Sequence, residues 1–235
     1  MVGEETSEAR AKSLEAPTDQ SPPPSLEKPR WRGWIHAVTA PVALAAGVVL
    51  TVRAPTAPAT AAAGIFSAAG VLLFTLSAVY HRGTWSPRTQ AILRRTDHAD
   101  ILLLIAGTYT PFAVLGLHGA PRVALLCVIW GGAGLGVAFR LAWIGAPRWA
   151  YVPVYLGLGW SAAFFLPQLA RGAGLTSLGL AAAGGVLYTL GGVVYALKRP
   201  DPAPRLFGFH EVFHALTVAA FACQYAAVSL LVYRA

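Results

Sequence analysis

The sequence of 235 residues is 56% apolar, and only 12% of its residues are charged. That charged fraction is about half of what a soluble domain carries, so an ordinary soluble fold is excluded. The net charge is +8, and the two cysteines, Cys127 and Cys223, each fall in the middle of an apolar segment. The composition therefore predicts neither a disulfide framework nor a cysteine metal site.

The first 30 residues differ from the rest of the chain. They are rich in Glu, Ser and Pro and contain six of the ten acidic residues. Such a segment cannot bury enough apolar surface to offset its ordering entropy, and it lacks the apolar core of a signal peptide. We therefore expect residues 1–30 to form a disordered cytosolic tail and residues 31–235 to form one membrane domain.

Seven apolar runs without Lys, Arg, Asp or Glu occupy the remaining sequence. In chain order they are 33–52, 54–81, 101–121, 123–139, 149–170, 172–197 and 212–233. Six contain at least 20 residues and one contains 17. About 20 apolar residues are enough to cross the hydrocarbon core of a bilayer. The sequence therefore predicts an all-α fold, an integral membrane bundle of seven transmembrane helices.

The basic residues are distributed unevenly between the two sides that seven spans create. Of the 18 Lys and Arg residues, 14 fall in the tail and in the second, fourth and sixth connections, and four fall on the other side. Cytosolic loops carry the excess of basic residues in membrane proteins. We therefore expect a cytosolic N-terminus, an external C-terminus, a place in the plasma membrane and no nucleic-acid partner.

Histidine and acidic side chains gather on the predicted cytosolic side. Ionisable groups at membrane depth are costly, so a cluster of them on one side indicates a functional site. The set comprises His36, His81, Asp97, His98, Asp100, His210, Glu211 and His214.

The spacing within this set favours a metal site. On a helix, His210 and His214 lie one turn apart and about 40° apart around the axis, so both rings can face one ion. Ser77 and His81 have the same spacing, and Asp97, at the expected start of its helix, can turn inward. Three imidazoles and one carboxylate suit a tetrahedral zinc ion, or three ligands with an open position for water. We predict that His81, Asp97, His210 and His214 bind zinc.

Two other interpretations of the histidines stay open. Residues 210–214 read His-Glu-x-x-His, the motif of zinc proteases, in which Glu211 would act as general base. A match of five residues is weak on its own, and no second protease motif accompanies it. Alternatively, a single histidine near the membrane surface is only a polar residue among the headgroups, which is the simpler interpretation of His36, His98 and His118.

Three blocks of the sequence resemble the signature blocks of the hemolysin III family. They are SAVYH at 77–81, DHADILLLIAGTYTPF at 97–112 and HEVFHALTVAAF at 210–221. That family is part of the progestin and adipoQ receptor superfamily, which also includes the adiponectin receptors. The resemblance implies a seven-helix bundle with a zinc site on the cytosolic side. His81, Asp97, His210 and His214 stand at the family's metal-binding positions.

The resemblance also implies a chemistry. A hydrolase mechanism related to that of the alkaline ceramidases is proposed for the wider superfamily, and its bacterial branch is linked to membrane lipid homeostasis. We expect hydrolysis of an amide or ester in a membrane lipid or fatty acyl substrate, with Ser77 as a catalytic side chain that orients the water or binds the oxyanion. Asp100, which stands where the family usually has a small or uncharged residue, is a second catalytic candidate that transfers protons from a position next to the metal ligands, and Glu211 is the alternative for that role. The alternative is a non-enzymatic lipid sensor or receptor-like protein in which zinc is structural and ties the helices together.

Overall fold

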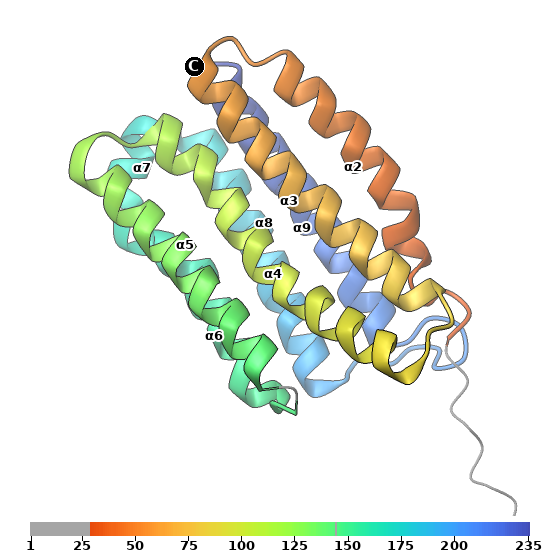
Figure 1. The fold of residues 1–235 in the computed structure, drawn as a ribbon. Helices are drawn as coiled ribbons and strands as arrows, with labels where there is room; N and C mark the ends of the chain where they lie inside the picture. Colours follow the sequence, from red (N-terminus) through yellow and green to blue (C-terminus); the bar gives the residue numbers. More distant parts are fainter. Residues whose placement is uncertain (1–28, 144) are drawn as a thin grey trace, which may run out of the picture.

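The computed structural model describes residues 29–143 and 145–235, so nearly all of the predicted tail at 1–30 lies outside the described residues. All regular secondary structure in the described part is helical, and seven segments are long and apolar enough to cross a membrane. This confirms the predicted all-α bundle with seven candidate spans. The described chain begins at one end of the bundle and finishes at the other, as an odd number of crossings requires (Figure 1).

Six spans are single helices and the fifth is composite. The single helices are α2 (Trp34–Val52), α3 (Ala57–Arg82), α4 (Pro87–Gly116), α5 (Gly119–Ala142), α8 (Leu175–Leu197) and α9 (Phe209–Val232). The composite span consists of α6 (Arg148–Trp160), the 3-10 turn η1 (Ser161–Phe165) and α7 (Leu166–Gly172). Pro167 accounts for the interruption, because it has no N–H to donate to the Ala163 carbonyl and its ring crowds that carbonyl.

Local capping residues set the starts of α3 and α4. The hydroxyls of Thr56 and Ser86 each accept a hydrogen bond from the backbone N–H three residues on, and a proline follows in the first turn. Because α4 begins at Pro87, the expectation that Asp97 opens its helix is wrong. A charge-free run marks the part of a helix that hydrocarbon can hold, whereas the helix itself continues until a cap or breaker ends it.

Helix α4 lies at the centre of the bundle, and 67% of its apolar window is buried inside the protein, the largest share of the seven spans. It packs against its chain neighbours α3 and α5 and also against α9. Helices α2, α3 and α9 lie together on one side of α4, and α5 and α6 lie on the other (Figure 1). Helix α8 packs against α6 and α9 and so closes the ring.

Glycines allow close approach where these helices meet. A Cβ added at Gly70 on α3 would lie 2.5 Å from the Phe221 ring of α9. One added at Gly136 on α5 would lie 2.8 Å from a methyl group of Leu102 on α4. These small residues therefore serve tight helix packing, as is common in membrane bundles.

One end of the bundle is tied together by its connecting segments. The backbone N–H of Arg30 donates to the Arg205 carbonyl at 3.1 Å, and that of Trp31 donates to the Leu206 carbonyl at 3.2 Å. These bonds join the segment before α2 to the connection between α8 and α9. The turn between α3 and α4 lies at the same end (Figure 1). We call this the proximal end, and the end that holds the C-terminus the distal end.

Candidate metal centre

Three histidines from two helices meet at the proximal end. His81 lies in the last turn of α3, and His210 and His214 lie one turn apart at the start of α9. One ring nitrogen from each lies within 4.8 Å of the other two. The Nε2 atoms of His81 and His210 are 3.1 Å apart, and the His210 and His214 ring centroids are 4.6 Å apart. The structure thus brings together three of the four residues predicted as metal ligands.

The spacing of these nitrogens fits a metal ion. Ligand atoms about 2.0–2.1 Å from a tetrahedral zinc lie about 3.3 Å from one another. The 3.1 Å between the His81 and His210 nitrogens is close to that value. His214 is buried, and its Nδ1 has no hydrogen-bond partner among the described residues. A cation bound between the three rings would give their facing nitrogens a common partner, which hydrogen bonds between the rings alone do not provide.

Asp97 and Ser77 lie beside the histidines. The Asp97 Oδ2 is 4.0 Å from His81 Nε2, so the carboxylate borders the three-histidine group without joining it as tightly. Ser77 lies one turn before His81 on α3, is almost fully buried, and its hydroxyl interacts with the Asp97 carboxylate. Side chains from α3, α4 and α9 therefore converge on one space, as the sequence predicted.

Asp100 lies one turn further along α4. It is buried, and its Oδ2 has no hydrogen-bond partner among the described residues. It does not line either of the two cavities described below, whereas Asp97 lines both. Its catalytic role stays a prediction.

The glutamate of the HExxH motif is engaged outside the histidine group. The Glu211 Oε1 accepts a hydrogen bond from Arg32 Nε at 2.5 Å, and its Oε2 accepts one from the backbone N–H of Gly208 at 2.8 Å. The carboxylate therefore forms an ion pair and caps the start of α9. A protease needs this glutamate beside the metal to activate water. Because both oxygens are used elsewhere, the geometry does not favour the protease interpretation.

A fourth histidine supports the centre from α2. The His36 ring stacks on His214 with centroids 3.8 Å apart and planes 10° from parallel. His36 is only 2% exposed, and neither ring nitrogen has a well-formed hydrogen bond among the described residues. The interpretation of His36 as a residue at the membrane surface is therefore wrong, because its ring packs inside the bundle against His214.

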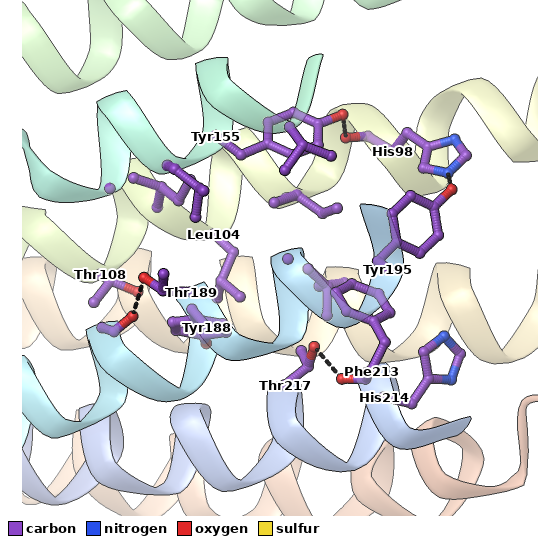
Figure 2. Close-up of a pocket in the computed structure, with 18 of the residues that line it drawn as sticks. His98, Leu104, Thr108, Tyr155, Tyr188, Thr189, Tyr195, Phe213, His214 and Thr217 are labelled. Carbon is purple, nitrogen blue, oxygen red and sulfur yellow. Dashed lines mark hydrogen bonds between the residues drawn. The ribbon is translucent and has the colours of Figure 1, made fainter. Parts of the chain in front are cut away.

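An apolar cavity runs from the histidines along the interior of the bundle. Its lining includes His210 and His214 at the proximal end and Gln224 further along α9. His210 and Gln224 are 14 residues apart on this helix, so the cavity follows about 21 Å of its axis. Figure 2 shows His214 at one end of this space and Thr108 towards the other, with apolar side chains between them.

A second, more polar cavity opens at the proximal end. Four arginines line it: Arg32, Arg94, Arg140 and Arg148. The two cavities share Asp97, His98, Tyr195 and His210 in their linings. They therefore meet at the histidine centre.

His98 belongs to a chain of hydrogen-bonded side chains between these cavities. Arg140 Nη2 donates to His98 Nδ1 at 3.3 Å. His98 Nε2 bonds the Tyr195 hydroxyl at 3.1 Å, as Figure 2 shows. The Tyr195 hydroxyl in turn bonds that of Tyr151 at 3.2 Å. Sequence reasoning missed this chain, because Arg140 reads as a topology signal and the tyrosines as ordinary interfacial residues. The one available signal was the length of the fourth charge-free run, which at 17 residues is the shortest and leaves Arg140 at the end of its span.

Comparison with known proteins assigns the family. The family model described as haemolysin-III related matches residues 25–225. The chain belongs to this family. Among haemolysin-III proteins, it is 29% identical to Hemolysin-3 of Bacillus cereus over 167 residues, which cover 70% of this chain and 76% of that protein. It is 31% identical to the Hemolysin-3 homolog of Bacillus subtilis (strain 168) over 164 residues, which cover 68% and 72% of the two chains.

The haemolysin-III match confirms the family that the three sequence blocks indicated. The matched segment contains His81, Asp97, His210 and His214. It also contains the arginine and tyrosine residues of the second cavity. Both cavities therefore belong to the haemolysin-III domain.

Proposed function

We propose that this haemolysin-III protein is a zinc-dependent hydrolase that cleaves an amide or ester bond of a membrane lipid and so acts in membrane lipid homeostasis. The observation that carries this proposal is a group of three histidines, two of which, His210 and His214, line the head of an apolar cavity within the bundle. A polar end joined to a long apolar space suits a substrate with one reactive polar bond and one hydrocarbon chain.

The hydrocarbon chain of the substrate occupies the apolar cavity. The lining of this cavity extends over about 21 Å of the α9 axis, a length suited to a fatty acyl chain. Gly185 and Gly192 of α8 contribute no side chain to the space they line. With the chain seated there, the carbonyl group at its head lies beside His210 and His214.

Residues of the protein itself supply the metal ligands and the polar contacts to the substrate. His81, His210 and His214 hold the zinc, and Asp97 borders them at 4.0 Å from His81 Nε2. A bound zinc ion supplies Lewis acidity, which polarises a carbonyl group and makes a water molecule a better nucleophile. Hydrolysis consumes one water and releases a fatty acid with an amine or an alcohol.

Two further side chains have roles in the proposed reaction. The Ser77 hydroxyl lines the cavity next to Asp97, where it orients the attacking water or donates to the carbonyl oxygen as negative charge develops there. Asp100, buried one turn along α4 from Asp97, takes part in proton transfer.

The proximal end faces the cytosol in this proposal. The excess of basic residues falls in the tail and the connections of that end, and cytosolic loops carry such an excess. The centre then opens towards the cytosolic leaflet of the plasma membrane, from which a lipid reaches the cavity between helices.

The test measures zinc content and acyl release on one preparation. Full-length protein is purified in detergent without chelators, assayed for metal, and incubated with a panel of lipid amides and esters while released fatty acid is quantified. We expect stoichiometric zinc and a release that is lost on chelation and in His214→Ala. Full activity in both would sink the proposal.

A second candidate function is favoured by the position of Asp97. Its carboxylate borders the three-histidine group at 4.0 Å from His81 Nε2, and a set of four protein ligands that included it would be the closed set typical of structural zinc. The protein would then sense lipids without cleaving them, with zinc tying α3, α4 and α9 together. Cobalt substitution separates the two functions, because azide changes the visible spectrum of a site with an exchangeable fourth position and leaves that of a site closed by four protein ligands unchanged.

A further inference from the structure

The second cavity carries an excess of positive charge. It is lined by Arg32, Arg94, Arg140 and Arg148, and among the described residues that line it Asp97 is the one carboxylate. Arg32 is paired with Glu211. No carboxylate of the described residues forms a salt bridge with the other three arginines. The cavity therefore presents cationic groups whose counter-charge the protein does not supply.

Arg140 shows that this charge is held inside the protein. Its side chain is 4% exposed, and neither Nε nor Nη1 has a hydrogen-bond partner among the described residues. The guanidinium carbon lies 4.3 Å from the centroid of the Tyr151 ring, and Nη2 donates to His98. The group is thus fixed by a ring on one face and a histidine at one edge, and two of its three nitrogens, Nε and Nη1, have no partner among the described residues. Buried donors on a charged group are costly unless a ligand or counter-ion completes them.

Arg148 on α6 has a similar environment. Its guanidinium carbon lies 4.5 Å from the centroid of the Tyr195 ring, and its Nη1 is also buried without a partner. The hydroxyls of Tyr195 and Tyr151 are bonded to each other, so the two rings that carry the arginines form one unit. Two planar guanidinium groups held next to one space match the oxygens of a phosphate, which arginine binds through paired N–H donors.

The distribution of basic residues across the membrane does not account for this arrangement. An arginine that only sets topology extends its charged end into water or headgroups, as the exposed Arg88 at the start of α4 does. Arg140 is instead buried and lines the second cavity, which meets the histidine centre. Burial of this charged group costs free energy, and an arginine that only sets topology would not need to be buried.

We propose that the second cavity binds the phosphate group of a lipid. The inference rests on the proposed function and names its substrate class, an acyl amide or ester of a phosphate-bearing lipid. The two cavities share Asp97, His98, Tyr195 and His210 in their linings. A phosphate next to Arg140 therefore places the carbonyl group of the same molecule at the histidine centre and its acyl chain in the apolar cavity.

The test is a binding measurement that involves no cleavage. Full-length protein in a phosphate-free maltoside detergent is titrated with an ether-linked lysophosphatidate, which has no ester bond to hydrolyse. An alkylglycerol with the same chain and inorganic phosphate are titrated in parallel at matched ionic strength. We expect the ether lysophosphatidate to bind about tenfold or more tightly than either, because it alone makes the charge-assisted bonds and fills the apolar cavity.

Single arginine variants locate the phosphate. Arg140→Gln and Arg94→Gln should each weaken binding of the ether lysophosphatidate by about tenfold. Arg94 is exposed at the cavity rim, so its replacement keeps the test decisive if Arg140→Gln fails to fold. Arg88→Gln is the matched control, because Arg88 is an exposed arginine of the same helix outside the cavity lining, and it should bind as the unaltered protein does.

Each other outcome overturns a stated part of the inference. If the alkylglycerol binds as tightly as the ether lysophosphatidate, the cavity does not recognise a phosphate group. If inorganic phosphate binds as tightly, the cavity binds free phosphate and not a phosphate-bearing lipid. If Arg88→Gln weakens binding of the ether lysophosphatidate as much as the cavity variants do, the lipid is held by general charge attraction and the second cavity is not its binding site. Lost phosphate selectivity with intact acyl release sinks this inference alone. Retained selectivity without acyl release from any lipid sinks the proposed function and leaves the phosphate site standing.

Discussion

Arg32 and Glu211 form an ion pair that joins the segment before the first span to the start of the last. Arg32 Nε lies 2.5 Å from Glu211 Oε1, and the Glu211 side chain is fully buried. The two residues are 179 positions apart in the chain. The pair therefore closes the proximal end of the bundle next to the histidine centre while its carboxylate stays outside the cavity.

Glu211→Gln should lower stability and leave the metal in place. The amide can still accept a hydrogen bond from Gly208, but Arg32 loses its counter-charge, so we expect a loss of about 2–3 kcal/mol in the free energy of unfolding. Thermal unfolding in detergent and zinc analysis measure the two effects. Arg32→Gln should cost a similar amount, and the double variant should cost less than the sum. Loss of acyl release as complete as in His214→Ala would instead favour the protease interpretation.

Ser77→Ala should keep the zinc and slow hydrolysis by about 10–100-fold. The hydroxyl that borders Asp97 is lost, and with it a donor to the reacting water or carbonyl oxygen. Acyl release at saturating substrate, measured together with metal content, reports this change. Ser67→Ala is the matched control, because Ser67 is a buried serine of the same helix whose hydroxyl bonds the Gly47 carbonyl away from the cavity. Equal rates in the two variants would leave Ser77 with a packing role only.

Gly192→Leu should narrow the apolar cavity and shift chain-length preference. A Cβ at this position meets Leu156 at 3.5 Å, an ordinary contact, so the larger side chain can enter the space that Gly192 lines. We expect release from long-chain lipids to fall more than release from short-chain ones, with zinc content unchanged. Gly134→Leu provides the control, because an added Cβ there meets nothing within 4 Å. An unchanged chain-length profile in Gly192→Leu would show that the acyl chain lies elsewhere.

Spacing along one helix was predictable from the sequence, and this is why the histidine pair of α9 and the Ser77–His81 pair of α3 lie where expected. Hydropathy also located the seven spans, because charge-free runs of sufficient length have few alternatives in a membrane. The histidine centre could be predicted because it forms where the proximal ends of α3, α4 and α9 meet. Helices that cross the membrane in alternating directions place those three ends on the same side.

Contacts that depend on how each helix is rotated about its axis in the bundle could not be predicted from the sequence. Whether a residue at a helix end faces lipid, water or protein is decided by packing against neighbouring helices, which composition does not encode. The ring of His36 stacks on His214, and the buried side chain of Arg140 lines the second cavity. The prediction that α4 begins at Asp97 was wrong for a local reason. Ser86 caps the helix well before its apolar run begins.

Reporter insertions should place the two ends of the bundle on opposite sides of the membrane. We expect a reporter in the turn after Thr84 to lie in the cytosol and one fused at Ala235 to lie outside, because the basic residues gather in the connections of the proximal end. A phosphatase reporter, active only outside, and a fluorescent reporter that folds only inside give complementary signals. Two reporters on the same side would refute the count of seven crossings, and a reversed pair would move the histidine centre to the external face.

Removal of a histidine should release the metal and loosen the bundle together. His210→Ala and His214→Ala each delete one of three closely spaced ring nitrogens, so zinc content measured by mass spectrometry should fall well below that of the unaltered protein. Because the metal joins α3 to α9, its binding free energy contributes to folding, and the thermal unfolding temperature should fall as well. His118→Ala is the control, since His118 is an exposed residue at the distal end, directly before α5, and this variant should retain both zinc and stability. Added zinc should raise the unfolding temperature of chelated unaltered protein and not that of the His210→Ala, His214→Ala double variant. If the unaltered protein, purified without chelators, holds no metal and the double variant is equally stable and active, the three histidines are a packed polar cluster and the zinc centre is wrong.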